Sequence, residues 1–351
     1  MLLQAWGIYW SFKEFGKLLS KDGSWFVLAA VRSTVVAKIP GGVSHLYKLL
    51  LHLFFGDLHS FSHGILLPLG EGGDPTVFTA SLQILIADED ARRAIFHCKG
   101  HGGLMLCMEC QNCIKPDSPL LKHSAWLRPS TCVVLSEFKP HTDKSVRAVL
   151  ADLQAKAADF ASGRLAKGAW EELQVHYGWN HQPDNFLLDS SLDVKIISAL
   201  MHDWMHIYLV TGLLQYELFG LFLFLNTHKS LAGKVWPMAS KFVGEFQWPR
   251  HLRSPSERVK PSTISEEGKH FRCSASEGLN LYPVLALFVV RVIAPLKILP
   301  KQVKSFLALC DVLDLLVTVI TGKVDADLLH AAIALHLQLY LVHATKNYYL
   351  L

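Results

Sequence analysis

The apolar positions of this chain follow two different periods, and the change between them divides the sequence into a front part and a rear part. In the front part, runs of β-branched and aromatic residues predict strands at residues 25–31, 33–37 and 77–86. Residues 1–20 carry aromatic side chains three and four positions apart, a spacing that predicts an amphipathic helix. Residues 44–55 predict a second short helix. We therefore expect the front part to mix strands and helices.

The rear part shows helical spacing almost throughout. An alanine-rich stretch at 142–173 predicts one long helix. Everything after residue 192 predicts helices, except a proline-containing loop at about 236–268. We expect an α+β, predominantly helical fold in three parts. These are an α/β portion with a Cys-rich loop at 1–115, a connecting insert with the long helix at 116–191, and a helical portion at 192–351.

The composition indicates a folded protein with a large core. Hydrophobic residues make up 51% of the 351 positions and charged residues 18%, which excludes a disordered chain. The net charge of +4 permits a polyanionic partner such as DNA without requiring one. Four of the seven cysteines fall within sixteen residues. This clustering favours a reducing, intracellular compartment with free thiols or a bound metal over disulfides.

One apolar segment is long enough to cross a membrane. Residues 207–225 contain a single charge, Glu217, near their middle. A charge at that depth costs about 2.5 to 3.5 kcal/mol on insertion scales, so we favour a buried helix of a soluble protein. A helical membrane protein with a span near 207–225 is the alternative interpretation.

The cysteine cluster is the first candidate site. Cys107 and Cys110 have the spacing of a zinc-binding pair, and Cys98 and Cys113 lie close by in the sequence. Thiolates suit tetrahedral zinc because the ion is a borderline-soft acceptor. A second spaced pair is missing, so reduced thiols packed in a loop are the competing interpretation. We take these four cysteines as candidate ligands of a structural zinc ion.

The second candidate site combines acids and histidines. His202, Asp203 and His206 share one helical face, which suits a metal ion in a hydrolase or a histidine oriented near a phosphate. Asp88 follows a strand-like run, and carboxylates at strand ends hold Mg²⁺ in phosphoryl-transfer enzymes. Both groups also have a structural interpretation, in which Asp88 belongs to an acidic helix start and Asp203 caps a helix. An independent metal-dependent hydrolase is therefore a further alternative.

Several short motifs, in order along nearly the whole chain, together resemble a known family. They are QAWGIYWS at 4–11, WFVL at 25–28, GGVS at 41–44, ILIADE at 84–89, Cys98 with Cys107 and Cys110, HDWMH at 202–206, and ASEGLNLYP at 275–283. In this order they resemble a multicopy transposase-like family abundant in dinoflagellate genomes. More distantly, the chain is similar to the DDE-type, RNase H-like DNA transposases of the CACTA superfamily.

The resemblance carries expectations for particular residues. Such transposases have an RNase H-like core in which three acidic residues bind two Mg²⁺ ions, with an inserted helical region. By this resemblance Asp88 corresponds to the second acid, Cys107 and Cys110 to a thiol pair after it, and Asp203 with His206 to a signature in the insert. The resemblance implies a partial RNase H-like α/β core, DNA as a partner, self-association and a nuclear location.

The same resemblance argues against DNA cleavage by this polypeptide. In the relatives the first acid lies upstream of the motif at 4–11, and the final glutamate lies beyond the segment where this chain stops. One acid out of three cannot hold a metal pair in place. We therefore expect a truncated or degenerate transposase-derived protein with a vestigial Asp88, without nuclease activity, that retains zinc and weak nucleic-acid binding.

Overall fold

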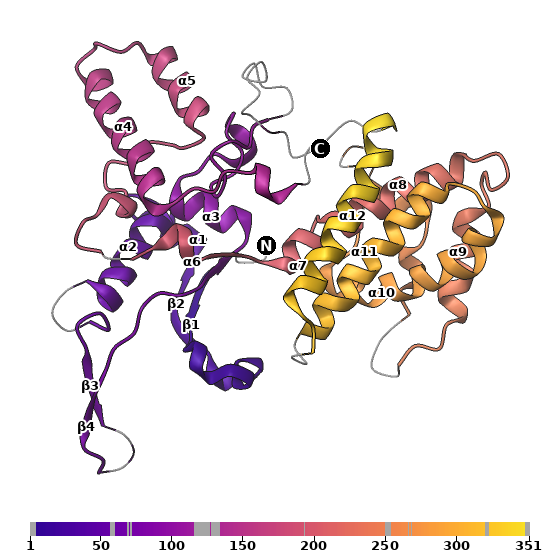
Figure 1. The fold of residues 1–351 in the computed structure, drawn as a ribbon, viewed down its shortest axis with the longest axis horizontal. Coiled ribbons are helices and arrows are strands. Elements are labelled where there is room, and N and C mark those ends of the chain that lie inside the picture. The colour runs from indigo at the N-terminus through magenta and orange to yellow at the C-terminus, as the bar shows by residue number, and fades with distance from the viewer. Residues whose placement is uncertain are drawn as a thin grey trace. The chain divides into compact units, whose positions relative to one another are not determined.

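The computed structural model describes residues 5–56, 60–68, 70, 72–115, 127, 134–192, 194–249, 254–265, 267, 269–319 and 323–347. The chain divides into two compact units, whose elements are labelled in Figure 1. The N-terminal unit comprises Met1–Trp126 and Phe138–Met201, and the C-terminal unit comprises Leu127–Glu137 and His202–Leu351. Helices dominate and the strands are short, which confirms the expected α+β, predominantly helical class.

A two-stranded sheet begins the N-terminal unit. β1 (Ala5–Trp10) runs antiparallel to β2 (Phe26–Arg32), and 3-10 turns at Lys13–Ser20 and Asp22–Ser24 lie between them. The amphipathic helix expected over residues 1–20 is therefore wrong. The strand expected at 25–31 corresponds to β2.

The ambiguity of the first segment has a physical cause. Trp6, Tyr9 and Trp10 stand three and four positions apart, which is helical spacing. In the folded unit Trp6, Ile8 and Trp10 are half-buried, and the residues between them are exposed. This period of two arises because pairing with β2 leaves one face of β1 towards the unit and the other towards solvent.

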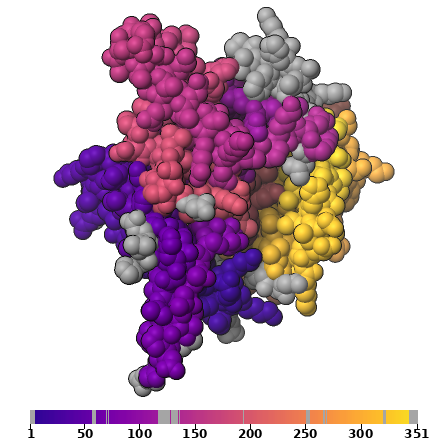
Figure 2. All heavy atoms as spheres, turned by 60° about the vertical axis from the view of Figure 1, so that its left-hand side comes forward, coloured from indigo at the N-terminus to yellow at the C-terminus, as the bar shows by residue number. Residues whose placement is uncertain are grey.

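Two further strand pairs belong to this part of the chain. β3 (Ile65–Pro68) and β4 (Pro75–Phe78) form an antiparallel hairpin that projects from its unit in Figure 2. β5 (Leu85–Ala87) pairs with β6 (Leu200–His202). The single strand expected at 77–86 is therefore two short strands. Every sheet formed by the described residues contains two strands.

Short helices follow several of these strands. α1 (Ser33–Val36) occupies the place of the strand expected at 33–37, which is wrong. The N–H of Ala37 donates to the carbonyl of Ser33 at 2.9 Å, so the β-branched run closes a helical turn instead of extending. The helix expected at 44–55 is α2 (Gly42–Phe55), which begins two residues earlier.

A helical hairpin replaces the single long helix expected at 142–173. α4 (Asp143–Ala161) and α5 (Lys167–Tyr177) lie side by side (Figure 1). Gly163, between them, has a φ of +74°, which glycine adopts without steric cost and which ends a helix. The chain therefore turns back where the alanine-rich pattern continues.

The core of the N-terminal unit draws on segments far apart in the sequence. α3 (Glu89–Phe96) and α6 (Ile196–Ala199) pack their apolar faces into it together with α2, α4 and α5. Its most deeply buried members are Phe96, Val146, Leu153, Phe186, Leu192 and Ile196. Helices α4 and α5, from the expected connecting insert at 116–191, thus contribute to the core of this unit.

The C-terminal unit is a bundle of longer apolar helices. Its helices are α7 (Trp204–Tyr208), α8 (Leu213–Thr227), α9 (Val235–Glu245), α10 (Ala275–Phe288), α11 (Pro300–Thr318) and α12 (Ala326–Asn347). The short strands β7 (Ile264–Ser265) and β8 (His270–Phe271) pair beside them. The loop expected at about 236–268 is partly wrong, because α9 occupies its first third and buries Trp236, Ala239 and Val243.

A polar cluster lies inside this apolar bundle. The Glu217 carboxylate on α8 accepts a 2.5 Å hydrogen bond from the Ser305 hydroxyl on α11 and lies 3.3 Å from Nε2 of His336 on α12. Glu217 is 5% exposed and His336 has no exposed surface. A buried carboxylate needs such partners because an isolated charge in apolar surroundings is costly.

Two helical stretches of the C-terminal unit, Trp204–Thr227 and Ala275–Leu296, are long and apolar enough to cross a membrane by length and composition. The core helices of a soluble protein have the same character, and 56% of the apolar window of the first stretch is buried inside the bundle.

Candidate functional site

Three of the four candidate cysteines lie in one tight hairpin. Residues 104–115, here called the thiol hairpin, turn back on themselves. The N–H of Leu106 donates to the carbonyl of Cys113 at 3.2 Å, and the N–H of Lys115 donates to the carbonyl of Leu104 at 2.9 Å. Cys107, Cys110 and Cys113 are therefore carried by one short, hydrogen-bonded segment, part of which the sequence presented only as a Cys-rich loop.

The thiols of Cys107 and Cys110 interact with each other. The Cys110 thiol donates a hydrogen bond to the Cys107 sulfur, which also accepts the N–H of Glu109 at 3.4 Å. The hydrogen bond from Cys110, aided by that N–H, lowers the pKa of Cys107 to about 7 despite its burial. The same contact raises the pKa of Cys110 well above its usual range. Cys107 is therefore the thiol of the pair that most readily becomes a thiolate.

Cys113 completes the thiol hairpin. Burial, and then the nearby charge of Cys107, raise the pKa of Cys113 to about 12. Thiolate sulfur is the ligand type that zinc prefers in structural sites, so the chemistry of these three residues fits the ion. Among the described residues, no three His, Cys, Asp or Glu side chains already surround a common point as they would around a metal ion.

A second segment supports the thiol hairpin from outside. The N–H of Gln111 donates to the carbonyl of Lys139 at 2.7 Å, and the N–H of His141 donates to the carbonyl of Glu109 at 2.7 Å. Burial lowers the pKa of His141, whose Nδ1 lies 2.9 Å from the Ser145 hydroxyl. No spacing in the sequence pointed to this contact, because it joins segments about thirty residues apart without a shared motif.

Asp88 lies at the start of a helix that reaches the thiol hairpin. It follows β5, and its Oδ1 accepts the N–H of Ala91 at 2.6 Å as the N-cap of α3. One turn further along α3, Nη1 of Arg92 donates to Oε1 of Glu109 at 3.1 Å. The observed contact of Asp88 is thus the one expected of an acid at a helix start. The ion pair of Arg92 with Glu109 fixes α3 against the segment that carries Cys107 and Cys110.

Cys98 has different neighbours. It forms an isolated β-bridge with Trp179, in the segment that follows α5. Burial raises the pKa of Cys98 to about 11, and the charges that act on it next belong to Arg92, Glu89 and Arg93 on α3. Cys98 therefore faces α3.

Asp203 and His206 are brought together, as their helical spacing indicates. Oδ2 of Asp203 lies 2.7 Å from Nδ1 of His206, and Oδ1 accepts the N–H of Met205 at 2.9 Å. His202 and His206 are exposed, whereas Trp204 and Met205 pack against the bundle core. Asp203 is thus the N-cap of α7, as its structural interpretation has it. It also orients His206, as the functional interpretation has it. Asp88 and Asp203 belong to different compact units.

Comparisons with known proteins add no relative to this picture. No protein-family model, no curated protein and no solved structure matches the chain.

Proposed function

We propose that this chain is a transposase-derived protein without nuclease activity that holds a structural zinc ion at the thiol hairpin and binds nucleic acid weakly. The observation that carries the proposal is the hydrogen-bonded hairpin that holds Cys107, Cys110 and Cys113 together, within which the thiols of Cys107 and Cys110 interact. Two interacting thiols on one tight hairpin need little rearrangement to share a metal ion.

The zinc ion would be held mainly from within the thiol hairpin. Cys107 and Cys110 would supply two ligands, and Cys113, whose pKa is raised by the nearby charge of Cys107, is the third candidate. Cys98, which faces α3, is the fourth candidate zinc ligand. Bound zinc would join residues otherwise connected by backbone hydrogen bonds and would stabilise this part of the N-terminal unit.

The proposed loss of nuclease activity concerns Asp88. By resemblance it is one of three carboxylates of a two-metal centre, and such a centre needs all of them. Its Oδ1 accepts the N–H of Ala91, so one oxygen already serves the helix start. The order of β5, Asp88 and α3 supports the finer assignment of a partial RNase H-like core, because acids at strand ends are the metal-binding positions of such sites.

Metal analysis of the purified full chain tests the zinc site. Protein expressed with added zinc is expected to contain about one zinc ion per chain, and the double variant C107S/C110S is expected to contain almost none. The variant Cys273→Ser, which removes a half-buried thiol from the C-terminal unit, is the matched control and should keep its zinc. Zinc-free wild-type protein, or a double variant that keeps its zinc, would contradict the proposal.

A DNA cleavage assay tests the proposed absence of nuclease activity. Duplex DNA incubated with the full chain and Mg²⁺ should stay intact, and Asp88→Asn should behave like the wild type. Mg²⁺-dependent cleavage that disappears in Asp88→Asn would show an active centre. Weak binding of the same duplex, falling steeply with salt, is expected from a net charge of +4.

A helical membrane protein is the second candidate, favoured by the two apolar stretches Trp204–Thr227 and Ala275–Leu296. Extraction of cell membranes with alkaline carbonate separates the candidates. A transposase-derived protein should enter the soluble fraction, and a spanning protein should stay with the lipid.

A further inference from the structure

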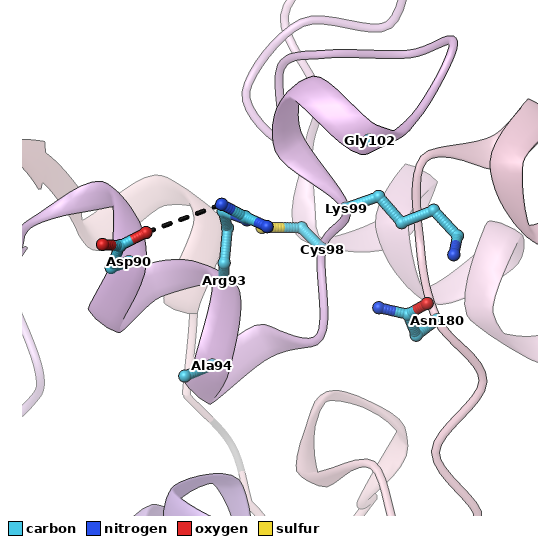
Figure 3. A pocket seen from close by; sticks show the side chains of 7 residues that line it. All are labelled: Asp90, Arg93, Ala94, Cys98, Lys99, Gly102 and Asn180. Atoms are coloured by element: carbon cyan, nitrogen blue, oxygen red, sulfur yellow. Dashed lines mark ion pairs between the residues drawn. The ribbon is translucent and has the colours of Figure 1, made fainter.

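A pocket of about 450 Å³ lies in the N-terminal unit, between α3, the glycine turn Gly100–Gly102 and the segment after α5 (Figure 3). Arg93, Lys99 and Asn180 line it. We propose that this pocket binds a phosphate monoester, with the phosphate held by the Arg93 guanidinium, the Lys99 ammonium and the Asn180 amide. This binding would not depend on the origin proposed above.

Arg93 offers a donor that the protein itself does not use. Its Nε is buried and has no hydrogen-bond partner. Nη1 lies 3.5 Å from the Asp90 carboxylate, which is 94% exposed, so water screens this ion pair and its contribution is small. Because that Nε is buried, a ligand in the pocket would be met by the terminal nitrogens of the guanidinium. The planar guanidinium also matches two oxygens of a phosphate at once.

Backbone pairing places Lys99 and Asn180 on facing segments. The N–H of Lys99 donates to the carbonyl of Gly178 at 2.7 Å, and the N–H of Asn180 donates to the carbonyl of His97 at 2.8 Å. In Figure 3 the Lys99 side chain extends towards the segment that carries Asn180. Because these two backbones are fixed against each other, the ammonium and the amide can meet one ligand at little cost in ordering.

Gly100 makes room for the Arg93 side chain. Its φ is +52°, and a Cβ at this position would lie 3.0 Å from Cδ of Arg93 and 2.9 Å from Oε1 of Glu89. Only glycine combines this backbone conformation with so close an approach. The acids Glu89 and Asp90 lie in the first turn of α3, where they offset the positive end of the helix dipole. Asp90 also lines the pocket, which therefore carries the two cations Arg93 and Lys99 and one exposed carboxylate.

The size of the pocket indicates more than a bare ion. Its volume falls within the range of roughly 300 to 1,000 Å³ that is typical of small-molecule sites. A phosphate at the cationic end leaves space along Ala94 and Cys98, which also line the pocket, for a sugar-sized group. The ligand class is therefore a phosphorylated small molecule, and a free phosphate or the phosphorylated end of a nucleic acid shares the same recognition chemistry.

Calorimetric titration of the full chain at low salt tests the proposal with AMP, adenosine, inorganic phosphate and a 5′-phosphorylated oligonucleotide. AMP should bind saturably and adenosine should not. Lys99→Met and Arg93→Met should each weaken AMP binding by roughly tenfold or more, which is the loss of one charge-assisted contact. Lys144→Met and Arg147→Met remove the same charges from exposed positions on α4 and are the matched controls.

The outcomes separate the site from non-specific attraction. The controls should stay within about twofold of the wild type, and circular dichroism should show every tested variant folded. If Arg93→Met does not fold, Lys99→Met carries the test. Equal binding of inorganic phosphate and AMP would mean that the phosphate alone is read, and preference for the oligonucleotide would identify a nucleic-acid end. Adenosine binding as well as AMP, no saturable binding at millimolar AMP, or controls as weak as the pocket variants would overturn the proposal.

Discussion

In the C-terminal unit, apolar helices surround the buried cluster of Glu217, Ser305 and His336, whereas in the N-terminal unit the candidate site lies beside the apolar core and is held by polar contacts. Phe288, Phe306 and Leu309 are almost completely buried between helices of the bundle. In the N-terminal unit the contacts of the candidate site are Arg92 with Glu109 and the backbone bonds of the thiol hairpin. Stability in the bundle should therefore follow apolar volume, and stability around the thiol hairpin should follow charge and metal.

The largest expected effect lies in the bundle core. Phe288→Ala empties a site with no exposed surface and should lower the free energy of unfolding by about 4 kcal/mol. Urea denaturation followed by circular dichroism measures the loss. Leu328→Ala, on an exposed position of α12, is the control and should change the free energy by less than about 0.5 kcal/mol. Equal losses in the two variants would show that the bundle is not packed as described.

The polar cluster inside the bundle comes next. His336→Leu leaves the Glu217 carboxylate without its partner on α12 and should cost about 3 kcal/mol of unfolding free energy. The double variant Glu217→Leu/His336→Leu removes both groups and should recover most of that loss, because apolar side chains of similar volume replace a desolvated pair. If the double variant is as unstable as the sum of the single variants, the two side chains do not interact.

Metal removal should act on one unit alone. A zinc chelator should speed hydrogen exchange at the amides of Leu106 and Lys115, which form the backbone hydrogen bonds of the thiol hairpin. Without the zinc ion that joins its sulfur atoms, the hairpin opens more often. Amides of α10 and α11 serve as the internal control, since their protection comes from apolar packing. Faster exchange in all of these segments would mean that metal supports the two units alike.

The smallest expected effect concerns pH and Asp189. Burial tends to raise the pKa of Asp189, but hydrogen bonds from Ser191, His52 and Lys48 outweigh it and hold the pKa well below its usual range. Because the folded pKa is depressed, this contact stabilises the fold above about pH 4 and is lost as pH falls through the folded value. Asp189→Asn should therefore cost about 1 kcal/mol at neutral pH and progressively less in acid.

Urea denaturation at several pH values measures the Asp189 effect. Asp184→Asn, at an exposed position nearby in the sequence, is the control and should leave the pH profile unchanged. A loss in Asp189→Asn that is independent of pH would assign the contact to packing instead of charge.

The sequence was a good guide where a single local period decides the structure. β2 followed from a β-branched run, and α2 followed from helical spacing. It misled where two periods overlap, as in β1, and where one residue ends an element, as at Gly163 between α4 and α5. Local patterns cannot show these outcomes, because strand pairing and a left-handed glycine conformation are settled by the rest of the fold.

The candidate site shows the same division. The Cys-x-x-Cys spacing indicated a thiol pair, and the thiols of Cys107 and Cys110 interact within one hairpin. The spacing of Asp203 and His206 likewise indicated their contact at 2.7 Å. The ion pair of Arg92 with Glu109 could not be foreseen, because it joins a helix to a hairpin without periodic relation. The pocket at Arg93 and Lys99 forms because residues 97–99 pair with the segment after α5. No sequence motif predicts that pairing.

X-ray absorption at the zinc edge tests the central proposal most directly, because it reports which atoms surround the metal in the full chain. A shell with at least two sulfur neighbours at about 2.3 Å is expected, reduced or lost in C107S/C110S and unchanged in Cys273→Ser. A shell of nitrogen and oxygen alone, or a sulfur shell unaffected by the double substitution, would contradict a zinc site at Cys107 and Cys110.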